Sequence, residues 1–162
     1  MKKWMTLTCA LLLLTNLLTA CGGKEEAAKP VDVDLAEFYA QVEETYEWGE
    51  GYMADIEGEL LDGYYPGLSE IPAKQLIAKA PMMSAVVNEM VFMQCETEDA
   101  AADAAAILQD RITVQAEGGA WYPESMEAWS KAIVIQQGTY VCMVASAEHQ
   151  DEISQSFNDL FL

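Results

Sequence analysis

The chain has 162 residues, of which 27 are acidic and 8 basic, and its formal net charge is −19. This length suits one domain, and this charge repels nucleic acid and anionic lipid headgroups, so we expect no nucleic-acid partner. The acidic residues are distributed along the whole chain, which favours a solubilising surface over an acidic tail. A cationic partner or bound cations are the alternative explanation of the charge.

Residues 1–20 have the layout of a secretory signal. Lys2 and Lys3 precede an apolar stretch at 4–18, which is shorter than the roughly 20 residues of a spanning helix. Residues 18–21, Leu-Thr-Ala-Cys, resemble a bacterial lipobox. The resemblance implies cleavage before Cys21 and a diacylglyceryl group on its sulfur, since only a thiol forms the thioether. The alternative is an ordinary secretory peptide with a chance cysteine.

We therefore expect a protein anchored in membrane lipid through Cys21, on the extracytoplasmic face of the cell membrane. Two or three acyl chains give firm anchoring, whereas one chain binds only marginally. Residues 21–33 are small and polar and predict a short flexible tether. Residues 34–162 are predicted to form a single domain.

The first part of this domain has helical patterns. Asp34 and Glu37 have the spacing of a capping box, and the helix that they begin should end near Gly49 or Gly51. A shorter helix is predicted over 52–61. An EF-hand loop starting at Asp55 is excluded, because its sixth and twelfth positions are Leu60 and Pro66. Residues 62–67 predict a turn, and a short helix is expected from Pro72 to Pro81.

The second part alternates strands and helices. Residues 84–95 are rich in β-branched and aromatic side chains and predict a strand, with a bulge at Asn88-Glu89; a helix is the alternative. Thr97 should cap a helix that ends at Gly118-Gly119. A short helix is expected from Pro123. Strands at 132–136 and 139–146 should form a hairpin, and a last helix, with Ile153, Phe157, Leu160 and Phe161 buried, should follow.

This order predicts an α+β fold with a small, mainly antiparallel sheet. A right-handed crossover makes the 84–95 and 132–136 strands parallel. The 139–146 strand is continuously apolar and should lie between them, antiparallel to both. The N-terminal, middle and C-terminal helices should then pack on this split βαβ sheet.

Several motifs together resemble the DUF4358 family. They are the lipobox, the acidic N-terminal helix, Ala-Pro-Met-Met at 80–83 before the strand with Asn88-Glu89, the helix that ends before an aromatic loop, Gly-Thr-Tyr-Val at 138–141 and Phe-Asn-Asp-Leu-Phe at 157–161. The resemblance covers nearly the whole chain after the leader. It implies a surface lipoprotein of Gram-positive bacteria, chiefly Clostridia. It implies no activity and no catalytic residues, because the family is a domain of unknown function.

The residues that most often carry catalysis are sparse. His149 is the sole histidine and has no partners at the spacing of a zinc site or an acid–base pair, so we expect a solvated residue at a helix start. Cys95 and Cys142 lie on apolar strands, where packing of free thiols is the favoured interpretation. A disulfide between them is the alternative, since exported proteins meet oxidising surroundings and the predicted strands are neighbours.

Aromatic residues provide the strongest candidate site. Trp121, Tyr122 and Trp129 lie in and after the aromatic loop, and large aromatic side chains on loops often bind partners or ligands. The alternative is that these rings cover the core. Tyr64-Tyr65 and Trp48 are weaker candidates of the same kind. The methionines at 82, 83, 90 and 93 fit core filling better than binding of a soft metal.

Two functions are consistent with these patterns. The first is a non-enzymatic binding or interaction module that takes an unknown protein or small-molecule ligand at the aromatic loop. The second is a cell-envelope hydrolase that uses carboxylates. The first is favoured, and no cofactor or metal is expected, because no catalytic or ligand motif accompanies the carboxylates.

Overall fold

The structure is a computed structural model that describes residues 32–83 and 85–162. The leader, Cys21 and the tether lie outside these residues, and so do the predictions made for them. From Asp32 to Leu162 the chain forms one compact unit.

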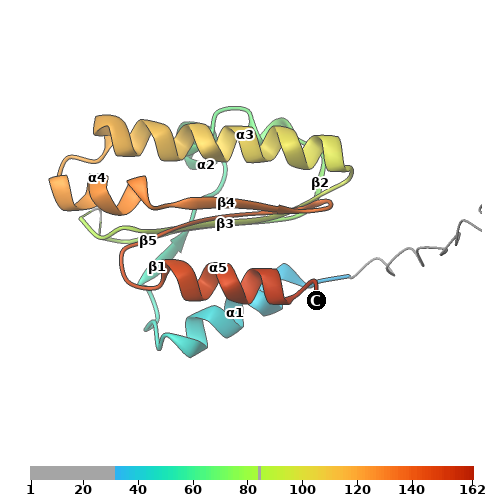
Figure 1. The fold of residues 1–162 in the computed structure, drawn as a ribbon, viewed down its shortest axis with the longest axis horizontal. Coiled ribbons are helices and arrows are strands. Elements are labelled where there is room, and N and C mark those ends of the chain that lie inside the picture. The colour runs from blue at the N-terminus through green and yellow to red at the C-terminus, as the bar shows by residue number, and fades with distance from the viewer. Residues whose placement is uncertain (1–31, 84) are drawn as a thin grey trace, which may run out of the picture. The chain divides into compact units, whose positions relative to one another are not determined.

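An antiparallel five-stranded sheet organises the described part of the chain (Figure 1). Its order is β1-β2-β3-β5-β4, in which β5 lies between β3 and β4. The predicted α+β class and the split arrangement of the last three strands are therefore confirmed. The strands are β1 (Met53–Asp55), β2 (Ala73–Pro81), β3 (Asn88–Cys95), β4 (Ile133–Gln137) and β5 (Tyr140–Ser146).

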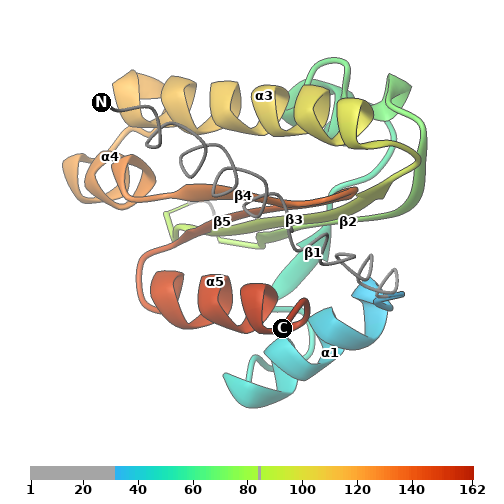
Figure 2. The ribbon, with the colours of Figure 1, turned by 45° about the vertical axis from the view of Figure 1, so that its right-hand side comes forward.

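Helices cover both faces of the sheet, so β3 and β5 are buried along their whole length (Figure 2). One face carries α1 (Leu35–Thr45) and α5 (Gln150–Asp159). The other carries α3 (Glu98–Val114), α4 (Pro123–Ser130) and the short α2 (Glu59–Tyr64). Successive side chains of a strand point to opposite faces. Phe92 therefore packs with α1 and α5, and Val91 with α3.

Helix boundaries follow the predicted capping residues. The Oδ1 atom of Asp34 accepts hydrogen bonds from the backbone N–H groups of Ala36 and Glu37, at 2.9 and 3.0 Å. Thr97 caps α3 through the N–H of Ala100. After α3 a single π turn spans Gln115–Gly119, and within it Gly118 has a φ of 130°, which is open to glycine but strained for other residues.

A polar cluster fixes the entry to α1. Gln75 on β2 donates to the carbonyl of Val33 at 2.8 Å and accepts from the N–H of Leu35 at 2.9 Å. The hydroxyl of Tyr140 accepts from the N–H of Val33 at 3.0 Å. The start of the described chain is thereby bonded to strands β2 and β5, which are far from it in sequence.

One predicted helix is a strand, and another is replaced by a short strand followed by a helix that begins later. The helix expected over 52–61 is wrong, because β1 occupies Met53–Asp55 and α2 begins only after Gly58. The helix expected from Pro72 to Pro81 is also wrong, because this segment is β2. Pairing with β1 on one side and β3 on the other satisfies the backbone of β2, and this tertiary pairing overrides its local helix preference.

Two further expectations for the central strands are corrected. Asn88 and Glu89 form no bulge but pair in register with Ser146 and Ala145, and the irregularity lies in β2 between residues 73 and 75. The disulfide alternative is also not realised. Cys95 and Cys142 are free and buried, and they belong to the cores on opposite faces of the sheet. Their thiols therefore cannot meet across the strand pair.

Candidate functional site

The three aromatic residues predicted as a site differ in their exposure to solvent. Trp121 is 91% exposed and Tyr122 is 58% exposed, in the connection that leads into α4. Trp129 is only 4% exposed and belongs to the core between α3, α4 and the sheet. Trp129 therefore covers the core, which was the alternative interpretation of these aromatic residues. Trp121 and Tyr122 are instead accessible to a ligand.

All three residues line one hollow, which we call the aromatic cleft. Its volume is about 520 Å³, and it lies at the end of the sheet where β3 begins. Pro81, at the end of β2, and Val86, in the connection between β2 and β3, also line the cleft. The full lining is Tyr64, Ala80, Pro81, Val86, Val87, Asn88, Glu89, Arg111, Gln115, Gly119, Ala120, Trp121, Tyr122, Ser125 and Trp129.

A buried ion pair forms the base of the aromatic cleft. Glu89 of β3 and Arg111 of α3 make two parallel hydrogen bonds, Nε to Oε1 and a terminal nitrogen to Oε2, both 2.9 Å long. Their side chains are only 7% and 14% exposed. The hydroxyl of Tyr65 donates to Oε1 of Glu89 at 2.7 Å. Bidentate pairing of this kind fixes both side chains in one geometry.

Aromatic rings surround the guanidinium of Arg111. Its carbon lies 4.4 Å from the ring centre of Tyr64, 5.4 Å from that of Trp129 and 5.9 Å from that of Tyr65. Contacts at these distances are attractive, because the ring faces are electronegative. Arg111 thus links β3, α2 and α4 from its position on α3.

The titration behaviour of this cluster follows from its burial. Burial, together with the charge and hydrogen bond of Glu89, raises the pKa of the Tyr65 hydroxyl well above its ordinary value. Burial alone would lower the pKa of Arg111, but its hydrogen bonds and attraction to Glu89 outweigh burial and raise that pKa. Both of these groups therefore keep their protons at neutral pH.

Comparison of the sequence with known families finds one match. A family model described as Domain of unknown function (DUF4358) matches residues 46–146. The chain belongs to this family. No curated protein and no solved structure shows a significant match to it. The matched region of this DUF4358 protein includes the whole sheet and every residue that lines the aromatic cleft, so the cleft lies inside the family domain.

Glu89 and Arg111 were missed as functional residues by sequence reasoning. Glu89 was interpreted as part of a bulge, and Arg111 was not singled out. A signal was available, because Arg111 is the sole arginine in a chain with 27 acidic residues, and Glu89 interrupts an apolar strand. A charged residue within a strand covered on both faces needs a partner of opposite charge.

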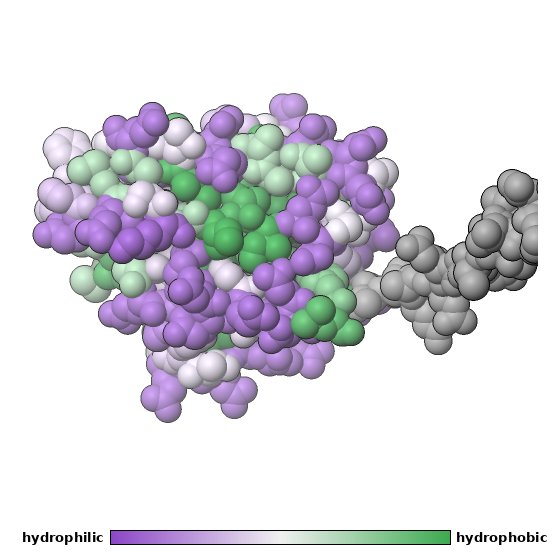
Figure 3. Space-filling view, viewed as in Figure 1, coloured by the Kyte–Doolittle hydropathy of each residue, from purple (hydrophilic) through white to green (hydrophobic). Residues whose placement is uncertain are grey.

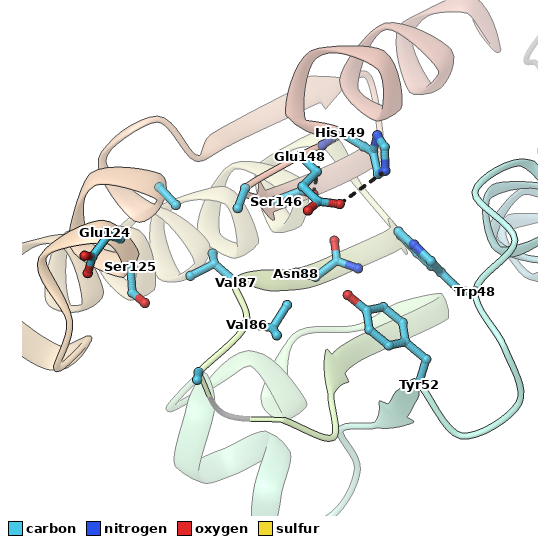
Figure 4. A pocket seen from close by; sticks show the side chains of 13 residues that line it. Trp48, Tyr52, Val86, Val87, Asn88, Glu124, Ser125, Ser146, Glu148 and His149 are labelled. Carbon is cyan, nitrogen blue, oxygen red and sulfur yellow. Dashed lines mark hydrogen bonds and ion pairs between the residues drawn. The ribbon is translucent and has the colours of Figure 1, made fainter.

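A second hollow, which we call the Trp48 pocket, adjoins the aromatic cleft (Figure 4). Its volume is about 330 Å³. It shares the wall formed by Val86, Val87, Asn88 and Ser125 with the cleft, and its other side is formed by Trp48, Tyr52 and His149. Trp48, a weaker candidate in the sequence, therefore lies at a pocket of its own.

Asn88 has an unusual position between the two hollows. It is only 3% exposed, and its Oδ1 atom has no hydrogen-bond partner within residues 32–83 and 85–162. Its Nδ2 atom contacts the sulfur of Met53 at 3.5 Å. A buried carbonyl without a donor costs about 1–3 kcal/mol, and such groups are uncommon in folded proteins.

His149 lies at a helix start, as expected, but its side chain is only 32% exposed. It precedes α5, and its ring stacks on Tyr46 with ring centres 4.1 Å apart. Its Nε2 atom lies 3.9 Å from a carboxylate oxygen of Glu148. The imidazole thus serves as part of an aromatic stack that continues from Tyr46 to Trp48, with ring centres 5.6 Å apart.

The described residues provide little for metal or thiol chemistry. Residues 32–83 and 85–162 contain no group of three or more His, Cys, Asp or Glu side chains placed to hold a metal ion. Met90 and Met93 are core residues, whereas Met82 and Met83 are exposed beside the cleft wall. Burial raises the pKa of both Cys95 and Cys142, which keeps these thiols protonated and unreactive.

A further apolar surface lies at the edge of the sheet. Figure 3 shows apolar side chains gathered in the middle of this face, at the level where Figure 1 places β4. On β4, Ile133 is exposed, and Val134 and Ile135 are half-buried. The strand is only five residues long, which restricts pairing with another chain.

Proposed function

We propose that this DUF4358 protein is a lipid-anchored, extracytoplasmic binding module whose ligand occupies the aromatic cleft. The leader and the lipobox-like segment ending at Cys21 support the anchor. Within the described part of the chain, no helix is long and apolar enough to cross a membrane. A tether of about a dozen residues would keep the cleft close to the cell surface.

The exposure of Trp121 is the observation that carries the binding role. Its indole is almost fully accessible at the rim of a cleft, although the neighbouring Trp129 is buried in the core. Covering about 100 Å² of this ring with a ligand would contribute about 2.5 kcal/mol to binding, at roughly 25 cal/mol per Å². Flat ring faces and apolar protein side chains are the partners that stack best on indole.

The base of the cleft supports the same proposal. Glu89, Arg111 and Tyr65 are joined by hydrogen bonds, so this part of the cleft lining is held in place before any ligand arrives. A preformed site avoids the entropy cost of ordering side chains on binding. The ion pair itself is satisfied, and the cleft therefore offers shape and aromatic surface more than an unpaired charge.

Metabolic labelling tests the anchor. Cells that express the full-length chain would be fed an alkyne-tagged fatty acid, and the protein would be examined for the tag and for its fraction in membranes. We expect a labelled membrane protein from the natural chain and an unlabelled, released one from Cys21→Ala. Cys142→Ala is the matched control and should stay labelled. Equal labelling of the Cys21→Ala chain would contradict the anchor.

Photo-crosslinking tests the cleft. A benzoyl-phenylalanine residue would replace Trp121 or, as a matched control, Leu60, which is also exposed but lines neither hollow. On irradiation of intact cells we expect a discrete adduct from position 121 that is absent from position 60. The same adducts from both positions would show non-specific contact and refute the cleft as the binding site.

A further inference from the structure

The walls of the Trp48 pocket combine aromatic rings and carboxylates. The ring centres of Trp48 and Tyr52 are 5.7 Å apart, with their planes inclined by 40°. Glu148 lies beside His149 and close to Asn88, whereas Glu124 lies next to Ser125 on the far side of the pocket (Figure 4). His149 is the sole basic side chain among the lining residues, and it is already stacked on Tyr46 and close to Glu148. The pocket therefore attracts cations and repels anions.

The floor of the pocket contributes a hydrogen-bond acceptor. The side chain of Asn88 projects from the start of β3 into the space between Tyr52 and Glu148 (Figure 4). Its Oδ1 atom accepts no hydrogen bond from the described residues, although Asn88 is nearly completely buried. A donor brought by a bound molecule would satisfy this oxygen, which distinguishes the pocket from a merely acidic surface.

We propose that the Trp48 pocket binds the primary ammonium group of a small alkylamine. One N–H of the ammonium is donated to Oδ1 of Asn88, and the nearby carboxylate of Glu148 balances its charge. The rings of Trp48 and Tyr52 cover the alkyl carbons and attract the cation. This site is distinct from the aromatic cleft, although Asn88 and its neighbours form the wall between the two.

The chemistry of the pocket excludes other ligand classes. A quaternary ammonium carries no N–H group and would leave Oδ1 of Asn88 without a donor. A neutral alcohol can donate a hydrogen bond but gains nothing from the carboxylates. A divalent metal ion prefers several oxygen ligands, whereas two aromatic rings occupy much of this wall.

Titration with three matched probes tests the proposal. The full-length chain in non-ionic detergent would be titrated with n-butylammonium, n-butyltrimethylammonium and n-butanol, and binding followed by ligand-observed NMR. We expect saturable binding of n-butylammonium and at least tenfold weaker binding of the other two. No saturation by n-butylammonium up to about 10 mM, or equal affinity for the trimethyl probe, would overturn the proposal.

Substitutions identify the groups responsible. Asn88→Leu should weaken n-butylammonium binding at least tenfold while the unfolding midpoint stays the same or rises, because an unpaired buried carbonyl is removed. Glu148→Gln, at an exposed position where folding is not at risk, should weaken binding about two- to fivefold. If either variant binds n-butylammonium as tightly as the natural chain does, the substituted residue does not bind the ammonium and the proposal is wrong. Trp121→Ala should retain full affinity, which separates this site from the aromatic cleft.

Discussion

Replacing Arg111 with methionine should destabilise the fold by about 3–5 kcal/mol. The magnitude follows from the geometry of the pair. Glu89 is 7% exposed and loses both of its 2.9 Å hydrogen bonds to Arg111, so a single donor, the hydroxyl of Tyr65, remains for a buried carboxylate. Domains of this size have total stabilities of about 5–15 kcal/mol, so the loss is a large fraction.

A double variant separates two free energies: the cost of leaving the Glu89 carboxylate without its partner, and the net contribution of the Glu89–Arg111 pair to stability. Glu89→Leu/Arg111→Met removes both charges and replaces them with apolar side chains. We expect it to be more stable than Arg111→Met alone, because buried ion pairs often contribute little compared with apolar residues of similar volume. The residual cost comes from Tyr65, whose hydroxyl loses its acceptor.

Urea unfolding followed by circular dichroism measures both variants. The unfolding midpoint of Arg111→Met should fall by about 10–20 °C in a parallel thermal scan. Added salt should have little effect on the difference in unfolding free energy between the natural chain and Arg111→Met, since screening acts mainly on exposed charges. Lys131→Met, which breaks the exposed pair with Glu127, is the control and should cost under about 1 kcal/mol. A loss below about 1 kcal/mol in Arg111→Met, or a double variant that is less stable than Arg111→Met, would show that Glu89 does not depend on Arg111 for its burial.

Three further predictions concern other parts of the molecule. Asp34→Ala should lower the free energy of unfolding by about 1 kcal/mol in urea titration, because α1 loses its cap, and Asp34→Asn should restore most of it. Trp121→Ala should change stability by under about 0.5 kcal/mol, whereas Trp129→Ala should cost about 3–5 kcal/mol, since their exposures are 91% and 4%; similar losses in the same titration would contradict the division between rim and core. Because burial raises the pKa of Cys142, the unfolded chain releases this thiol proton above about pH 8.5 while the folded chain retains it, so stability falls as pH rises from there. Cys142→Ala should reduce this fall by up to about 1.4 kcal/mol per pH unit between pH 8.5 and 9.5, and equal slopes in urea titrations of the two proteins would disprove the link.

The elements predicted correctly from the sequence carry local signals. Asp34 and Thr97 are capping residues directly before periodic apolar patterns, and Gly118 has its positive φ in the π turn that follows α3. The apolar run of β5 required cover on both faces, which only a central strand receives. These signals lie within a few residues of the structure that they specify.

The elements that were missed depend on distant partners. Residues 73–81 contain helix-forming alanine and lysine, yet Leu76 and Ile77 point to opposite faces of the sheet, as strand residues do. The conformation of these residues is decided by pairing with β1 and β3, and the local sequence pattern carries no information on that pairing. The same holds for Met53–Asp55, where the salt bridge from Asp55 to Lys79 at 2.7 Å crosses the strand pair.

The candidate site shows the same division. Trp121 and Tyr122 were predicted as binding residues because large aromatic side chains on a loop are visible in the sequence. The base of the cleft was not predicted, because Glu89 and Arg111 are 22 residues apart and meet only when α3 crosses β3. Asn88 was likewise interpreted as a break in the strand, since its unpaired oxygen is a property of the packed structure.

A thermal-shift comparison tests the central claim, that the aromatic cleft is a binding site, most directly. The full-length chain in non-ionic detergent would be screened against fractionated small molecules from the cells that produce it, in parallel with Trp121→Ala and the control Leu60→Ala. A ligand that binds the folded state raises the unfolding midpoint. We expect a fraction that raises the midpoint of the natural chain and of Leu60→Ala but not of Trp121→Ala. An equal rise in all three proteins would mean that the ligand binds outside the aromatic cleft.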